Sequence, residues 1–304
     1  MGQPRAEFPQ DDQGLSLRAF GALEPPPPRN PAGFSSPLRQ GALRGGVAIT
    51  YSSYLHVGEL LQLQKPLSDG PEHDEMLFIV IHQVYELWFK QILHEANYLH
   101  HALETKQTPA AQRTLKRILT IMKTVVAQID VLETMTPLQF NAFRDRLDTA
   151  SGFQSEQFRR LEWALGHRGA GRVGHLPKAV QAEFEALSQK PSLWDAFLRY
   201  LVASGYAVPT AQLERRFAEP VTASEEVQAI LLNVYRSDPA TSQTAELLLD
   251  LDEGLQEWRY RHVKMVERTI GMKMGTGGSA GAEYLRSTLF RAVFPDLWAV
   301  RSKL

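Results

Sequence analysis

The sequence predicts an all-α protein from two observations. From about residue 50 onward, apolar residues recur at three- and four-residue steps, the period of an amphipathic helix, and alternating strand-like runs are scarce. Residues 73–104 contain neither proline nor glycine, the residues that most often interrupt helices. We therefore expect a helical bundle with one long buried central helix.

The central helix is predicted to cover residues 73–104. Asp74 and Glu75 lie in its first turn, where carboxylates stabilise the positive end of the helix dipole. Residues 76–89 are apolar on nearly every face, which is typical of a helix surrounded by others. At ~1.5 Å per residue the helix would be roughly 45 Å long.

Further helices are predicted along the rest of the chain. Thr136-Pro137 opens one of them, because proline is tolerated in a first turn, and Ser151-Gly152 separates two others. The remaining helical patterns cover about residues 110–133, 138–147, 154–165, 178–204, 222–236 and 240–270, and residues 169–176 are expected to form a connector.

Residues 1–46 have a different composition. They include Pro25-Pro26-Pro27-Pro28 and Gly45-Gly46 and show little hydrophobic periodicity. Such a segment cannot bury enough apolar surface to offset the entropy that ordering would cost. We expect residues 1–46 to be a disordered N-terminal tail and residues 47–304 to form a single all-helical domain.

Composition excludes several classes of function. The chain has 304 residues, 33 Lys+Arg against 34 Asp+Glu, a formal net charge of −1 and no cysteine. Without cysteine there is no disulfide framework, thiolate zinc site, Fe–S cluster or cysteine nucleophile. Without a basic field we expect no nucleic-acid partner. No apolar run approaches the ~20 residues of a membrane span, and no secretory signal is visible, so we expect a cytoplasmic protein that does not enter a membrane.

Histidine is therefore the main candidate for metal or haem ligation. None of the nine histidines belongs to an HExxH or Glu-x-x-His motif, which disfavours zinc and di-iron sites. His82 lies in the most apolar part of the long helix, either as a core histidine bonded to Glu86 or a backbone carbonyl, or as a ligand or catalytic group. His262 shares a helix face with Trp258 and Met265, which suits a flat apolar cofactor, although a lone histidine on such a face is more often structural.

Two further features could bind a ligand. Arg144 shares a helix face with Phe140 and Leu147, where a guanidinium could bind a small-molecule carboxylate or form an ion pair with a neighbouring aspartate. Residues 271–281 are glycine-rich without the lysine of a phosphate-binding loop, so they form either a flexible linker or a loop that closes over a ligand.

Several blocks of the sequence, in the same order, resemble the tryptophan 2,3-dioxygenase family. Together they extend from about residue 50 to residue 290. The blocks are Tyr51-Ser52-Ser53-Tyr54-Leu55, Gln64-Lys65-Pro66-Leu67-Ser68, His73-Asp74-Glu75-Met76-Leu77-Phe78-Ile79, His82-Gln83, Glu86-Leu87-Trp88, Phe143-Arg144-Asp145, Ser151-Gly152-Phe153-Gln154-Ser155, Arg261-His262, Thr269-Ile270-Gly271 and Gly275-Thr276-Gly277-Gly278-Ser279.

The resemblance implies an all-helical, homotetrameric enzyme with one haem b per subunit, which opens the indole ring of L-tryptophan with O₂ to give N-formyl-L-kynurenine. It implies that His262 is the axial ligand of the haem iron and that His82 is a catalytic residue that hydrogen-bonds the indole N–H. Ser151 and Gly152 are expected to contact the cofactor. The residues expected to bind the substrate are Phe78, Ile79, Val80, Ile81, His82, Phe140, Arg144, Thr276 and, from a neighbouring subunit, Tyr51 and Tyr54.

Three alternatives remain open at this point. The first is a related haem-dependent oxygenase that acts on a modified tryptophan or tyrosine in secondary metabolism. The second is a haem sensor without turnover, and the third is a purely structural helical bundle.

Overall fold

The structure is a computed structural model that describes residues 49–168, 173–275 and 281–304. Residues Ser52–Leu304 form one compact unit, and of the other unit, Met1–Tyr51, only the last three residues are described. The predicted tail, residues 1–46, therefore lies outside the described residues. Within the described ranges the ordered elements are all helices, which confirms the all-α prediction.

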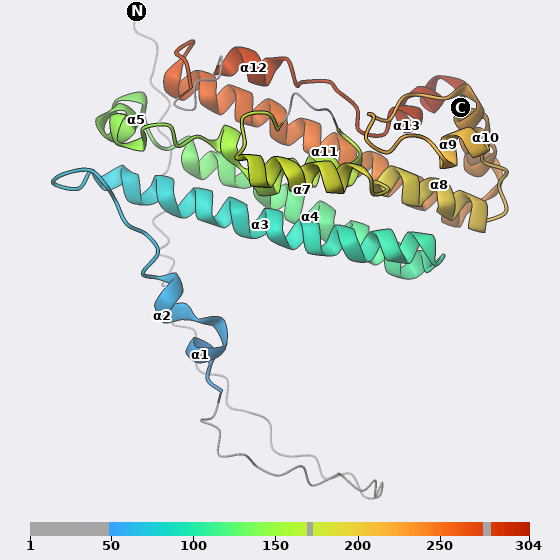
Figure 1. The fold of residues 1–304 in the computed structure, drawn as a ribbon, viewed down its shortest axis with the longest axis horizontal. Coiled ribbons are helices and arrows are strands. Elements are labelled where there is room, and N and C mark those ends of the chain that lie inside the picture. The colour runs from blue at the N-terminus through green and yellow to red at the C-terminus, as the bar shows by residue number, and fades with distance from the viewer. Residues whose placement is uncertain (1–48, 169–172, 276–280) are drawn as a thin grey trace, which may run out of the picture. The chain divides into compact units, whose positions relative to one another are not determined.

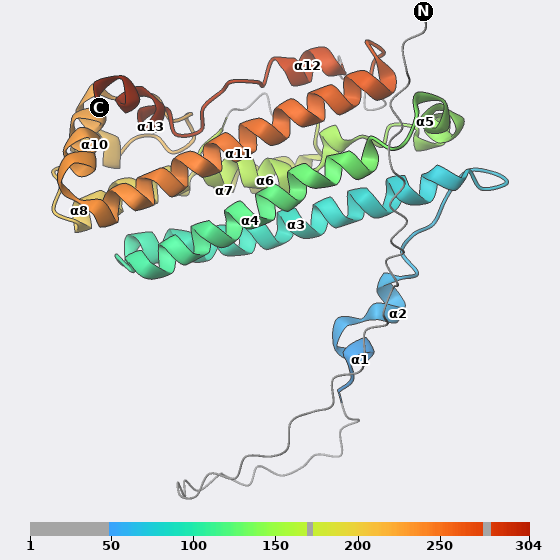
Figure 2. The same ribbon diagram turned by 180° about the vertical axis from the view of Figure 1, so that it is seen from behind.

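Three long helices form the centre of the bundle: α3 (His73–Glu104), α4 (Thr108–Leu132) and α11 (Pro239–Ile270). They lie side by side in both views of the ribbon (Figures 1 and 2). The start of α11 is set by Asp238, whose carboxylate accepts the N–H of Thr241 at 3.0 Å, and by Pro239 in the first turn.

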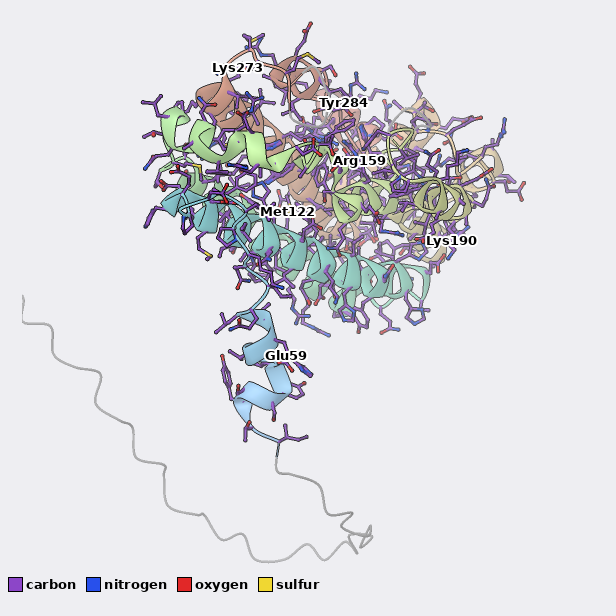
Figure 3. All side chains as sticks on the ribbon, turned by 60° about the vertical axis from the view of Figure 1, so that its left-hand side comes forward. Glu59, Met122, Arg159, Lys190, Lys273 and Tyr284 are labelled. Carbon is purple, nitrogen blue, oxygen red and sulfur yellow. The ribbon has the colours of Figure 1, made fainter. Side chains whose placement is uncertain are left out.

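Helices α4 and α11 pack against each other. A Cβ atom built on Gly254 of α11 would be 3.8 Å from the Cβ of Met122 on α4, an ordinary contact distance, so the packing does not require a glycine at this position. Figure 3 draws the side chains on the ribbon, with Met122 labelled. Leu115 and Val125 of α4 and Leu248 of α11 are completely buried there. This packing positions α11 beside α4.

Shorter helices surround the three long ones. The pattern over residues 178–204 yields two helices rather than one, because Ser192 caps a new helix directly after Pro191. The shorter elements are α1 (Tyr51–Leu55), α2 (Val57–Leu60), α5 (Pro137–Arg144), η1 (Asp145–Leu147), η2 (Gly152–Gln154), α6 (Glu156–Leu165), α7 (Lys178–Ser188), α8 (Leu193–Ala203), α9 (Thr210–Leu213), α10 (Glu225–Ser237), α12 (Ala282–Arg286), α13 (Pro295–Ala299) and η4 (Val300–Lys303).

Helix α3 differs in one respect from the expectation that it is buried on nearly every face. Met76, Val80 and Leu87 are 42%, 39% and 52% exposed. These residues follow one another at helical spacing, so in a single chain one stripe of α3 faces outward while Ile81, Tyr85 and Phe89 face the core. No helix in the described ranges is long and apolar enough to serve as a membrane span.

A buried carboxylate attaches the C-terminal segment to α11. Asp252 is fully buried, and its Oδ2 accepts the backbone N–H groups of Val293 and Phe294, each at 2.8 Å, and the indole N–H of Trp298 at 3.0 Å. Gln256 donates to the other oxygen at 3.0 Å. One side chain therefore satisfies four donors, three of them from residues more than forty positions further along the chain.

We predict that Asp252→Ala lowers the free energy of unfolding by about 3 kcal/mol or more, because each buried donor left without an acceptor costs about 1–3 kcal/mol. Urea unfolding followed by circular dichroism measures this loss. The control is Glu253→Ala, one residue along the same helix and exposed, for which a change within about 0.5 kcal/mol is expected. Equal losses in the two variants would contradict the anchoring role.

Candidate active site

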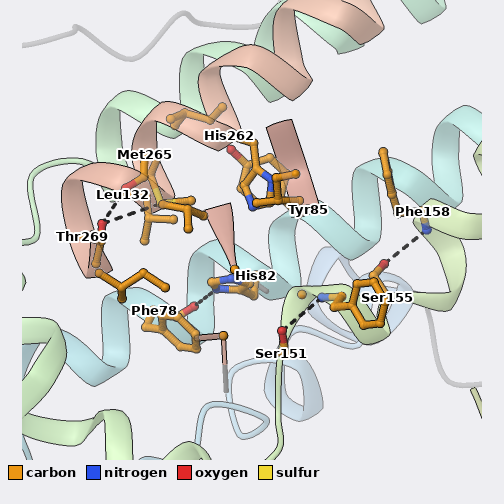
Figure 4. A pocket seen from close by; sticks show the side chains of 18 of the residues that line it. Phe78, His82, Tyr85, Leu132, Ser151, Ser155, Phe158, His262, Met265 and Thr269 are labelled. Atoms are coloured by element: carbon orange, nitrogen blue, oxygen red, sulfur yellow. Dashed lines mark hydrogen bonds between the residues drawn. The ribbon is translucent and has the colours of Figure 1, made fainter. Parts of the chain in front are cut away.

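A largely apolar cavity of about 230 Å³ lies between α3, α5, α6 and α11. Among the residues that were predicted to form the site, those that line this cavity are Phe78, His82, Phe140, Arg144, Ser151, Gly152 and His262. These residues come from four separate segments of the sequence, and Figure 4 shows Phe78, His82, Ser151 and His262 around the cavity.

His82 reaches the cavity from α3 with one nitrogen already bonded. Its Nδ1 is 2.7 Å from the carbonyl oxygen of Phe78, one turn earlier, and the two rings are 4.1 Å apart. A carbonyl only accepts hydrogen bonds, so Nδ1 carries the proton. Burial lowers the pKa of His82, and this effect exceeds the opposing effects of the Phe78 carbonyl and Glu86. A neutral ring with Nδ1 protonated leaves Nε2 as a hydrogen-bond acceptor.

This geometry combines the two interpretations of His82 that the sequence left open. The ring is bonded to a backbone carbonyl, as a core histidine would be, and it also lines the cavity.

His262 reaches the same cavity from α11. Burial, together with the smaller effect of the neighbouring His82, lowers the pKa of His262 to about 4. The imidazole is therefore neutral at pH 7 and keeps a nitrogen lone pair. Trp258, Met265 and Val266, its predicted neighbours on one helix face, also line the cavity. Within the described ranges no group of three or more histidine or acidic side chains is placed to hold a metal ion.

Three buried charged side chains that were not predicted as site residues form part of the cavity wall. Arg159 donates to Glu162 at 2.6 Å and Arg259 donates to the other oxygen of Glu162 at 2.7 Å. All three residues are at most 6% exposed, and the Nε of Arg159 has no hydrogen-bond partner. Two guanidinium groups thus share one carboxylate, which leaves this part of the wall with one excess positive charge.

Glu86, one turn after His82, connects α3 to the start of α6. Its carboxylate accepts the hydroxyl of Ser155 at 2.6 Å and the side-chain amide of Gln157 at 2.9 Å. The Ser155 oxygen in turn accepts the N–H of Phe158 at 3.2 Å and caps α6. The same contacts therefore position both α6 and the Ser151–Ser155 segment beside the cavity.

Arg144 lies at the edge of the cavity and donates to the carbonyl oxygen of Met274 at 2.6 Å. Met274 belongs to the glycine-rich segment, residues 271–281, of which Gly275 and Gly281 line the cavity. Gly281 has φ +59°, and a Cβ there would lie 2.6 Å from the Lys273 carbonyl oxygen, so only glycine fits. Thr276, the predicted partner of the substrate ammonium group, lies outside the described residues.

Three of the residues predicted to bind the substrate, Ile79, Val80 and Ile81, do not line this cavity. Ile81 is 6% exposed and packs in the hydrophobic core, and Val80 is exposed. The other α3 residues that line the cavity with His82 are Phe78, one turn before it, and Tyr85, Glu86 and Phe89 after it. Tyr51 and Tyr54 are 78% and 72% exposed, and their contact with a neighbouring subunit stays a prediction.

The fold and the cavity together define a helical bundle with a largely apolar internal site, which is lined by one histidine from α3 and one from α11. The family model described as tryptophan 2,3-dioxygenase matches residues 38–196 and 207–304, and the chain belongs to this family.

Curated relatives of the same name agree with this assignment. Tryptophan 2,3-dioxygenase from Herpetosiphon aurantiacus is 59% identical over 258 residues, 84% of this chain and 99% of the relative. The protein of that name from Anaeromyxobacter sp. strain K is 58% identical over 259 residues, 84% of this chain and 97% of the relative. The one from Caulobacter vibrioides is 45% identical over 263 residues, 84% and 98% of the two chains.

We predict that Glu162→Gln destabilises the protein by about 3–5 kcal/mol, because two buried guanidinium groups lose their counter-charge. Urea unfolding of the protein without cofactor measures the change. The matched control is Glu246→Gln, which removes the half-exposed ion pair with Arg301 and should cost less than about 1 kcal/mol. A loss at Glu162 no larger than at Glu246 would show that the cluster is hydrated rather than buried.

Proposed function

We propose that this chain is a haem-dependent dioxygenase that cleaves the indole C2–C3 bond of L-tryptophan with O₂ and releases N-formyl-L-kynurenine, the first step of tryptophan catabolism through kynurenine. The family to which it belongs oxidises tryptophan to this product. The observation that supports the proposal best is the pair of neutral histidines, one from α3 and one from α11, that face a single apolar cavity with Arg144 at its edge.

The cofactor in this proposal is one haem b per subunit, with His262 as the axial ligand of the iron. A neutral imidazole on an apolar, aromatic helix face is the donor such a ligand requires. The two carboxylates of haem are anions, and the buried Arg159, whose Nε lacks a partner, belongs to a cluster with one excess positive charge. Ser151 and Gly152 lie in the cavity wall, where they would contact the cofactor.

When bound, haem in its ferrous form supplies the activation of O₂. The chain supplies orientation and exclusion of water. Nε2 of His82 is free to accept the indole N–H, because Nδ1 is committed to the Phe78 carbonyl. Phe78, Phe140 and Phe143 form a contiguous aromatic cluster with ring centroids 5.4–5.8 Å apart, which would hold an indole against His82 by ring contacts.

Arg144 would bind the carboxylate of the amino acid. In the structure its guanidinium donates to the Met274 carbonyl, a neutral acceptor, and a substrate carboxylate would replace that contact by a charge-assisted pair. A substrate fixed at both ends, at the indole N–H and at the carboxylate, loses the rotational freedom that would slow the reaction. Thr276 is proposed to meet the ammonium group.

The remaining parts of the proposal concern assembly and location. The resemblance implies a homotetramer in which Tyr51 and Tyr54 reach a neighbouring subunit, and the exposure of both tyrosines is compatible with such a contact. We expect the enzyme to work in the cytoplasm, with L-tryptophan and O₂ as its only small-molecule partners.

The proposal is tested by the spectrum and the product of one preparation. We predict that the reconstituted, reduced protein shows a histidine-ligated haem spectrum and converts L-tryptophan under ¹⁸O₂ to N-formylkynurenine that contains two labelled atoms. His262→Ala should lose haem and activity together. One labelled atom in an intact ring would support an oxygenase of modified aromatic amino acids, and haem without substrate loss would support a sensor.

We predict that Arg144→Ala raises KM for L-tryptophan by about 10- to 100-fold, the equivalent of a charge-assisted hydrogen bond of roughly 1.5–3 kcal/mol. KM for tryptamine, which lacks the carboxylate, should hardly change in steady-state assays. The control is Arg146→Ala, on the adjacent turn, where the arginine pairs with the exposed Asp69 instead of facing the cavity. Equal effects of Arg144→Ala on both substrates would disprove the carboxylate contact.

A further inference from the structure

The ring of His262 is stacked on an aromatic side chain of the same helix. A histidine that binds a metal almost always donates its second ring N–H to a carboxylate, a carbonyl or water, and this bond sets the plane of the ring. In the part of the chain that the structure describes, the His262 ring makes no hydrogen bond to another residue. It lies instead against Trp258, one turn earlier on α11, with ring centroids 5.0 Å apart and planes inclined by only 13°.

The indole of Trp258 is itself held from two other helices. Phe158 of α6 packs on it with centroids 4.6 Å apart at 39°, and Phe89 of α3 meets it edge-on at 6.0 Å and 86°. Phe89 and Phe158 also contact each other at 5.4 Å. Because the hydrogen bond between Ser155 and Glu86 fixes the start of α6 on α3, both supports of the indole are joined at a common point. Trp258 therefore cannot tilt unless α3 or α6 moves.

The aromatic face of Trp258 is the part of the side chain that meets His262. Its Nε1 is buried and has no hydrogen-bond partner within the described residues.

We propose that Trp258 is a positioning residue for His262: its indole face, stacked on the imidazole, fixes the plane of that ring. The proposal rests on the proposed function, because it assigns the role to a histidine that ligates haem iron. In this proposal, Phe89, Phe158 and Trp258 support the axial ligand in addition to packing as core residues.

The orientation is tested first without cofactor, by ¹H–¹³C NMR of protein labelled at the histidine Cε1 positions. The His262 signal, assigned by its loss in His262→Asn, should be displaced by the ring current of the stacked indole. It should return to the range of the other buried histidines in Trp258→Leu. A His262 signal that does not respond to Trp258→Leu would overturn the proposal, whatever the protein does with haem.

The consequence for the ligand is tested in the haem-loaded protein by two readouts other than turnover. In Trp258→Leu the iron–histidine stretching band of the ferrous protein should broaden or shift, and haem transfer to an apoglobin acceptor should be about 10-fold faster, the lower range of losses when a ligand's support is removed. Trp258→Phe keeps an aromatic face without the N–H and should restore both readouts to near the parent values. If Trp258→Phe behaves like Trp258→Leu, the N–H matters rather than the face, and the proposal is wrong.

A matched control is available in the same chain. Trp163 is also buried, also has an Nε1 without a partner, and packs on Phe184 in a separate hydrophobic cluster away from the cavity. Trp163→Leu should reduce stability while the iron–histidine band stays unchanged; a changed band would mean that general loosening of the protein explains the effect. If the parent protein takes up no haem at all, the proposed function fails, whereas the NMR experiment still decides the orientation of His262.

Discussion

The burial of two imidazole rings among packed helices is the constraint on which the site depends. His82 and His262 reach one cavity from helices that both pack against α4, and burial lowers the pKa of each ring. A neutral ring keeps a nitrogen lone pair, which in the proposed function Nε2 of His82 offers to a donor on the substrate and a nitrogen of His262 offers to the haem iron. Full hydration of the two rings would return each pKa toward its ordinary value.

Burial also decides how the charged residues around the cavity are paired. A buried charge is tolerated only where it is paired, so Arg159 and Arg259 converge on Glu162, and the Glu86 carboxylate is satisfied by Ser155 and Gln157. Arg159, Arg259 and Glu162 together carry one more positive charge than negative charge, which suits an anionic ligand. The contacts of Glu86 fasten α6 to α3, and thereby fix the aromatic side chains that surround Trp258.

Much of the fold and part of the site could be predicted from the residue pattern. The predicted long helix over residues 73–104 has the bounds His73–Glu104 in the structure, and His82, Arg144 and His262 all line one cavity. The buried ion cluster could not be predicted, because Arg159 and Glu162 three residues apart on a helix resemble an ordinary exposed pair. The outward stripe of α3 was missed for the opposite reason: its apolar residues resemble those that face the core.

The sequence by itself determined the helices and the kind of chemistry available. Helical periodicity, caps and breaks act over a few residues. Because the chain has no cysteine, histidine is its main candidate for ligating a metal or a haem iron. Only the tertiary structure decided which groups are buried and paired. Arg259 and Glu162 are 97 positions apart, and Arg144 meets the Met274 carbonyl across 130 positions. Such contacts depend on how whole helices pack, because desolvation is a property of the three-dimensional surroundings and not of any local pattern.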